Sequence, residues 1–235
     1  MFARFRRLAC AALVLSIGVV GPLWADSKNL APGFSGLKKG ALVTVMQPDV
    51  ELFSISAGGV PEPKADWTDS AIKHVQEALN QKSAELGLKT RELSEDEADE
   101  LAEINTLHAA VARSIALHHL TAGNLSLPTK DGKLDWSLGD AVQPLRQKSG
   151  ADYALFIWMR DSYASAERKV AMVAFALLGV GIAGGVQTGY ASLVDLRTGQ
   201  VLWFNKLLRG TGDLREAEPA RETVMALLKD FPEAE

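Results

Sequence analysis

Two stretches decide the fold class: residues 150–156, GADYALF, and residues 189–203, GYASLVDLRTGQVLW. The first opens an apolar run that continues to residue 159 and predicts a strand buried on both faces. In the second, residues 190–194 and 201–207 flank a turn at 195–199, which predicts a β-hairpin. The chain is therefore expected to complete a sheet with antiparallel strands.

Outward from these stretches, predicted strands and helices alternate along the chain. Apolar or alternating runs predict strands, and apolar residues spaced three and four apart predict helices. Ser94 and Glu97 form a capping box that opens the longest predicted helix. The other predicted strands cover 41–46, 50–55 and 88–93, the predicted helices cover 66–86, 94–120, 139–148 and 216–231, and a loop covers 57–63. This order predicts an α/β fold, in which one mixed sheet covered by helices forms a single domain over residues 41–232.

Composition excludes several classes of protein. The chain has 235 residues, of which 47% are apolar and 23% charged, and its formal charge is −4. These values do not fit a disordered chain or a polytopic membrane protein, and they offer no basic surface for nucleic acid. Residues 26–40, which include Pro32 and three glycines, predict a flexible tether.

The first 25 residues have the order of a secretory signal peptide. Three arginines precede a short apolar segment at 11–20, and cleavage is expected after Ala25. The alternative is a retained anchor helix, but that segment is shorter than the ~20 residues that a membrane span needs. Cys10 precedes the apolar segment, whereas a lipidated cysteine would follow it. We therefore expect an exported protein in the periplasm or at the periplasmic face of an envelope membrane.

Residues 170–194 form a run of 25 residues without a charged side chain. Three interpretations remain open: a membrane-spanning helix, a projecting apolar hairpin or short helix that touches lipid or another subunit, and a buried core segment. Its last five residues belong to the predicted hairpin, which favours an apolar insertion at 170–188 over a full span. The expected membrane or partner contacts are Val170, Met172, Phe175, Leu177, Leu178, Val180, Ile182 and Val186.

Glycine spacing within this run matches two known motifs. Gly181 and Gly185 have the Gly-x-x-x-Gly spacing that lets helices approach closely, which agrees with self-association. Residues 179–184 match the dinucleotide motif Gly-x-Gly-x-x-Gly. That motif requires a preceding strand, a following helix and an acid about 20 residues onward, and the acid here comes too early. We expect no cofactor.

Few other residues have a pattern typical of a catalytic, metal-binding or partner-binding site. His108, His118 and His119 share a predicted helix, but the first two lie on its apolar stripe, so we expect no metal site. No nucleophile motif is present, and we expect no catalytic residue. Trp67 and Trp136 each follow an aspartate before a predicted helix and could line a surface for a protein partner.

The order of elements and the final hairpin resemble a superfamily of exported bacterial envelope proteins. Residues 150–156 and 189–203 carry the resemblance, which covers about 41–230 in element order. Members include the curli secretion-channel lipoprotein, penicillin-binding-protein activator lipoproteins and the N-terminal domain of TolB, and the chain is most similar to uncharacterised members. The resemblance implies a TolB N-terminal-like fold and a structural or regulatory role without catalysis.

Two functions follow as hypotheses. The first is a non-enzymatic envelope protein, an accessory in assembly, secretion or regulation that uses residues 170–188 to contact a membrane, a protein partner or a second copy. The alternative is an exported small-molecule-binding protein or hydrolase whose pocket is built from the loops 57–67 and 121–137.

Overall fold

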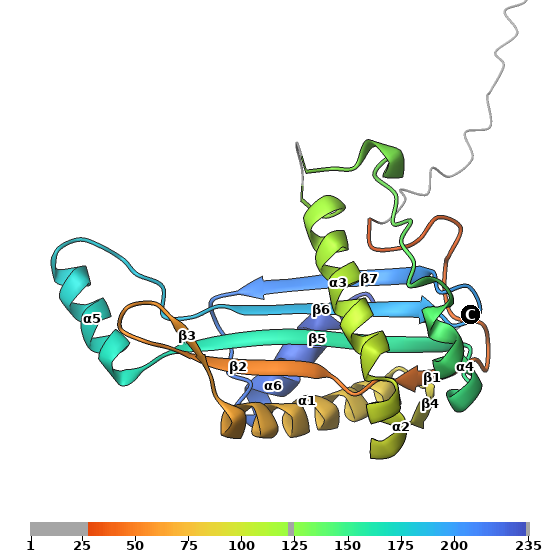
Figure 1. Cartoon of the computed structure of the whole chain (residues 1–235), viewed down its shortest axis with the longest axis horizontal. Helices are drawn as coiled ribbons and strands as arrows, with labels where there is room; N and C mark the ends of the chain where they lie inside the picture. Colours follow the sequence, from red (N-terminus) through yellow and green to blue (C-terminus); the bar gives the residue numbers. More distant parts are fainter. Residues whose placement is uncertain (1–27, 122–124, 234–235) are drawn as a thin grey trace, which may run out of the picture.

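The computed structural model describes residues 28–121 and 125–233, and within them the chain forms one sheet flanked by helices (Figure 1). The strands are β1 (Leu42–Val45), β2 (Asp49–Ile55), β3 (Pro61–Pro63), β4 (Lys89–Glu92), β5 (Tyr153–Ala164), β6 (Gln187–Asp195) and β7 (Val201–Arg209). The α-helices are α1 (Ala65–Glu85), α2 (Glu95–Glu100), α3 (Ala102–His118), α4 (Gln143–Ser149), α5 (Ala166–Leu177) and α6 (Ala217–Leu227). The 3₁₀ helices are η1 (Pro128–Lys130) and η2 (Gly139–Val142). The predicted signal peptide lies outside the described residues.

Strand β5 is the centre of the sheet. Along one edge it pairs in parallel with β1 near its start and with β2 near its end, and along the other edge it pairs antiparallel with β6. Strand β7 completes the predicted hairpin with β6, while β3 and β4 lie at the far margins. The prediction of a single mixed α/β sheet is thus confirmed.

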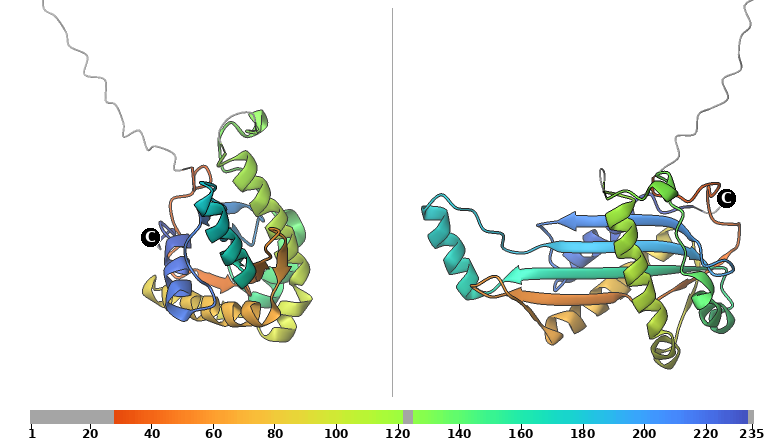
Figure 2. Two further views of the ribbon diagram at one scale, coloured as in Figure 1. Left: turned by 90° about the vertical axis from the view of Figure 1, so that its left-hand side faces the viewer. Right: turned by 45° about the horizontal axis from the view of Figure 1, so that its top comes forward.

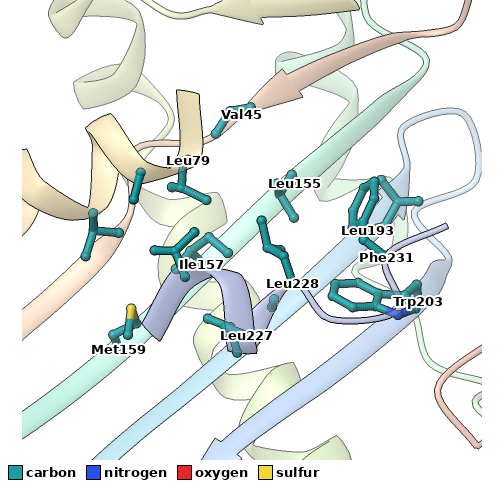
Figure 3. Close-up of a cluster of buried hydrophobic side chains, with 14 of the residues drawn as sticks. Val45, Leu79, Leu155, Ile157, Met159, Leu193, Trp203, Leu227, Leu228 and Phe231 are labelled. Carbon is teal, nitrogen blue, oxygen red and sulfur yellow. The ribbon is translucent and has the colours of Figure 1, made fainter. Parts of the chain in front are cut away.

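Strand β5 is continuously apolar over residues 153–159 because both faces of the sheet are covered there. Leu155, Ile157 and Met159 point into a core formed with α1 and α6, whereas Phe156 and Trp158 point into a second core. Figure 3 shows the first of these cores, where Leu227 of α6 packs beside the strand side chains. A strand buried on both faces has no polar side to present to water, which explains the run seen in the sequence.

The helices form layers on the two faces. Helices α1 and α6 lie side by side on one face, and α3 crosses the other face with α4 at one end (Figures 1 and 2). The capping box is present, since Glu97 N donates to Ser94 Oγ at 3.3 Å and Ser94 N donates to Glu97 Oε2 at 3.0 Å. The prediction of a single helix over 94–120 is wrong. The helix breaks at Leu101, which leaves helical geometry while its side chain is buried in the second core.

The segment expected to be a tether is packed from Asn29 onward. Ala31 N donates to Leu202 O at 2.8 Å and Phe204 N donates to Asn29 O at 2.9 Å, so this segment extends the sheet beside β7. Leu37 is buried in the first core. The prediction of a flexible tether is therefore wrong from Asn29 onward, because apolar residues among the glycines and lysines bind the sheet edge. The loop expected at 57–63 also contains the short strand β3.

Candidate functional site

Helix α5 projects beyond the end of the sheet (Figures 1 and 2). None of its residues is buried, although its last eight residues are all apolar. Of the large apolar side chains that are exposed in the described residues, most lie in this helix and its return segment: Val170, Val173, Phe175, Leu177, Leu178, Val180 and Val186. Leu177 is 83% exposed and Leu178 77% exposed. An apolar patch of this kind marks an interaction surface in soluble proteins.

The structure distinguishes among the interpretations of residues 170–194. The buried-core interpretation is wrong for 170–186 and holds for the strand residues that follow. Among the described residues, no helix combines the length and the apolar character needed to cross a membrane. The insertion expected at 170–188 begins as a helix at Ala166, and Gln187 already belongs to β6. Met172 and Ile182 are half-buried, while the other expected contact residues are exposed.

Arg168 fixes the base of this helix. Its guanidinium donates from Nε and Nη2 to Ala183 O, at 3.1 and 2.8 Å, and from Nη1 to Ser56 O at 3.5 Å. Ser165 caps the helix by accepting from Arg168 N. The projecting helix is therefore held in a defined direction by its own return segment and by the β2–β3 turn.

Gly185 lies against the backbone of β5. A Cβ atom built there would be 1.8 Å from Ser162 O, whereas a Cβ at Gly181 would meet nothing within 4 Å. Both glycines lie in the irregular segment after α5, so the helix-packing interpretation of their spacing is wrong. Gly185 instead allows Ser162 N to donate to Val186 O at 3.1 Å.

Gly185→Ala is expected to lower the free energy of unfolding by about 1–3 kcal/mol, because a methyl group would overlap a backbone carbonyl that cannot rotate away. Gly181→Ala is the matched control and should change the stability by less than about 0.5 kcal/mol. Chemical denaturation followed by circular dichroism measures both. Equal stability of the two variants would contradict the close approach of the return segment to β5.

A buried polar cluster lies where the return segment meets the sheet. The Asp161 carboxylate, 3% exposed, accepts from Tyr163 OH at 2.5 Å, Gln187 Nε2 at 2.6 Å and Ser162 N at 2.8 Å. Gln187 Oε1 in turn accepts from Arg209 Nε at 2.8 Å. Burial raises the pKa of Asp161, although these hydrogen bonds oppose the effect. Burial and the neighbouring carboxylate raise the pKa of Tyr163.

Arg215 closes one side of this cluster. Its guanidinium lies 3.8 Å from the Tyr163 ring centroid and 4.7 Å from that of Trp67, and the two rings meet edge to face at 5.8 Å. Asp213 accepts from Arg215 Nε at 2.8 Å and from Nη2 at 2.6 Å, which lowers the pKa of the Asp213 carboxyl. Trp67 is half-buried in this stack, and its expected role in a partner surface remains a prediction.

A cleft of about 400 Å³ opens between this cluster and the base of α5. Its walls come from the end of β5, the first turns of α5, the return segment and the loop after β7. The residues that line it are 161–164, Lys169, Met172, 184–187, 210–212 and Arg215. Sequence reasoning missed this cleft, although the Gly184-Gly185 pair and the Gly-Thr-Gly segment at 210–212 are signals of close backbone approach.

The pocket expected from the loops 57–67 and 121–137 is not formed in the described residues, because these loops lie at opposite ends of the sheet. Ile55, which leads into the first loop, pairs with Ala164 at the end of β5. Trp136 O accepts from Val201 N at 2.8 Å, beside the β6–β7 turn. This turn lies at the start of β5. Trp136 itself is half-buried against the second core, and its expected role in a partner surface remains a prediction.

The three histidines of the helix predicted over 94–120 take separate partners. His108 is buried, with Nε2 2.8 Å from Ser192 Oγ and its ring stacked on Phe156 at 4.7 Å. Burial lowers the pKa of His108 to about 3. His118 and His119 each contact a backbone carbonyl oxygen. Within the described residues, no group of three His, Cys, Asp or Glu side chains is placed to hold a metal ion.

The geometry defines a mixed α/β protein with an exposed apolar helix and a cleft at the base of that helix. No protein-family model matches the chain, and no curated protein matches it.

Several solved structures are similar in fold at low sequence identity. The PelC dodecamer from Paraburkholderia phytofirmans is 13% identical over 86% of this chain and 94% of that chain, with a TM-score of 0.41. Lipoprotein GNA1162 from Neisseria meningitidis is 13% identical over 81% and 99%, with a TM-score of 0.33. The LpoB C-terminal domain from Salmonella enterica is 13% identical over 76% and 87%, with a TM-score of 0.29.

Proposed function

We propose that this chain is a non-enzymatic accessory protein of the cell envelope that acts through contact of α5 and its return segment with a membrane or a protein partner. The exposure of the whole helix carries the proposal. Seven large apolar side chains between Val170 and Val186 face solvent, whereas the rest of the described fold buries most of its large apolar residues in two cores. Leaving such a surface in water is unfavourable by roughly 25 cal/mol for each Å² of apolar area, so contact with an apolar partner would stabilise it.

The arrangement of polar groups around α5 supports this proposal. Arg168 and its carbonyl acceptors hold the helix away from the sheet rather than folded onto it. The signal-peptide pattern in residues 1–25 supports export to the envelope, and the resemblance of the final hairpin to exported envelope proteins supports an accessory role.

The test replaces residues 170–186 with a Gly/Ser linker and follows the protein in fractionated cells. We expect the wild type to remain in the membrane fraction, or in an assembly larger than one chain, and the linker variant to be released as a soluble monomer. Retention of both forms at the same location and size would refute the proposed role of α5.

A second pair of variants tests the apolar contact while the length of the insertion stays unchanged. Leu177→Asp combined with Leu178→Asp places two charges at the tip of α5, where both side chains are exposed and neither holds the fold. The matched control is Leu117→Asp, which changes an exposed leucine on α3. We expect release only with the α5 variant, at unchanged thermal stability, and equal release with the control would count against the proposal.

A further inference from the structure

Several residues that line the cleft at the base of α5 have backbone amides without an acceptor among the described residues. These lining residues are Gly184, Gly185, Gly210, Thr211 and Gly212, and within the described residues none of their backbone amides donates to an acceptor. They lie on two segments, one before β6 and one after β7, that line the same cleft. Adjacent backbone N–H groups in irregular segments form concave sites for anions.

The charged side chains of the cleft favour the same kind of ligand. Lys169 lines the cleft, and its ammonium group makes no ion pair or hydrogen bond with any described residue. Arg215 is a second cation of the lining, but the paired carboxylate of Asp213 offsets its charge. The Asp161 carboxylate is the acid of the lining, and three donors already cover its oxygens. An entering anion would therefore meet free donors and an unpaired lysine.

The position of the cleft relative to α5 indicates where the anion comes from. Lys169 belongs to the first turn of α5, and residues 170–178, which include Met172 of the cleft lining, are all apolar. These nine residues span about 14 Å, roughly half the hydrocarbon thickness of a bilayer. Because apolar residues occur on every side of the helix, lipid fits it better than a protein groove, which would cover one face. A helix inserted to this depth places its base, and the cleft, at the level of the headgroups.

We propose that the cleft at the base of α5 binds a phosphate group, and that an anionic phospholipid headgroup supplies this phosphate when α5 enters one leaflet of a membrane. The inference rests on the proposed function for the lipid source, but the phosphate site itself does not depend on it. Lys169 neutralises the phosphate, and the glycine amides donate to its oxygens. The apolar helix determines how deeply the protein inserts into the leaflet. The cleft makes the protein prefer anionic lipid.

The first experiment measures flotation of the purified full chain with phosphatidylcholine vesicles that contain or lack phosphatidylglycerol. We expect the wild type to prefer the phosphatidylglycerol vesicles. Lys169→Glu should lower binding to these vesicles by about tenfold or more, the size expected for loss of a charge-assisted contact with phosphate and repulsion by the new carboxylate. Lys169→Arg should restore most of the binding. Lys73→Glu on α1 makes the same charge change on an exposed lysine outside the cleft and is the control for net charge.

The second experiment titrates the same proteins with inorganic phosphate by calorimetry at low ionic strength. If the wild type binds inorganic phosphate and Lys169→Glu does not, the result supports the site. This holds even if the variants at Leu177 and Leu178 leave vesicle binding unchanged. That combination would refute lipid insertion while retaining a site for free phosphate. Vesicle binding that depends on Lys169, without binding of inorganic phosphate, identifies the headgroup as the source. Equal behaviour of the wild type, Lys169→Glu and Lys73→Glu in both experiments would overturn the proposed site, whether or not α5 binds membranes.

Discussion

Trp203→Ala is expected to lower the free energy of unfolding by about 3–5 kcal/mol, the range measured when a buried aromatic side chain is truncated to alanine. Trp203 on β7 is fully buried, and its ring meets Phe231 edge to face at 5.2 Å. It lies opposite Leu193 of β6 (Figure 3). Its backbone bridges to Leu30 in the N-terminal segment. Truncation would leave a cavity where the hairpin, the C-terminal residues and the N-terminal segment meet.

Denaturation in guanidinium, followed by far-ultraviolet circular dichroism, measures this loss. Trp136→Ala is the matched control, because this tryptophan is half-buried and should lose less stability. Trp203→Phe retains most of the volume and removes an indole N–H that has no partner in the described residues, so its cost should be below that of the alanine variant. A loss of less than about 1 kcal/mol for Trp203→Ala would show that this junction does not stabilise the fold.

Acidification is expected to destabilise the protein through His108, whose pKa is lowered by burial to about 3 from an ordinary 6.5. Above pH 6.5 the imidazole is neutral in the folded and unfolded chain and contributes no pH dependence. Between pH 6.5 and pH 3 the unfolded chain binds a proton that the folded protein excludes, so the free energy of unfolding falls by about 1.4 kcal/mol for each pH unit.

His108→Gln removes this titration while retaining a polar side chain opposite Ser192. Denaturation curves collected from pH 7.5 to pH 4 should show a shallower loss of stability for the variant than for the wild type. The variant should be less stable than the wild type at neutral pH, because glutamine does not reproduce the stacking on Phe156. Parallel curves for the two proteins across this range would contradict the role assigned to His108.

Several elements could be predicted from local sequence because their cause is local. The apolar run in β5, the turn of the β6–β7 hairpin and the Ser94–Glu97 capping box each depend on residues close in the chain. The spacing of apolar residues and the types of residue in a turn determine such elements before any long-range contact forms. The mixed α/β class follows from their order, since strands that alternate with helices pack most readily as one covered sheet.

By itself the sequence determined that residues 170–194 carry no charged side chain and that residues 190–207 form a β-hairpin. Only the tertiary structure decided that α5 remains exposed, that the segment from Asn29 packs on β7, and that Lys169 faces a cleft. The physical reason is that the hydrophobicity of a side chain determines its preference for burial or exposure. Strand pairing determines which residues, distant in the chain, it contacts. Residues 161, 187 and 212 line one cleft because β5, β6 and β7 pair in one register, a long-range relation that no local pattern records.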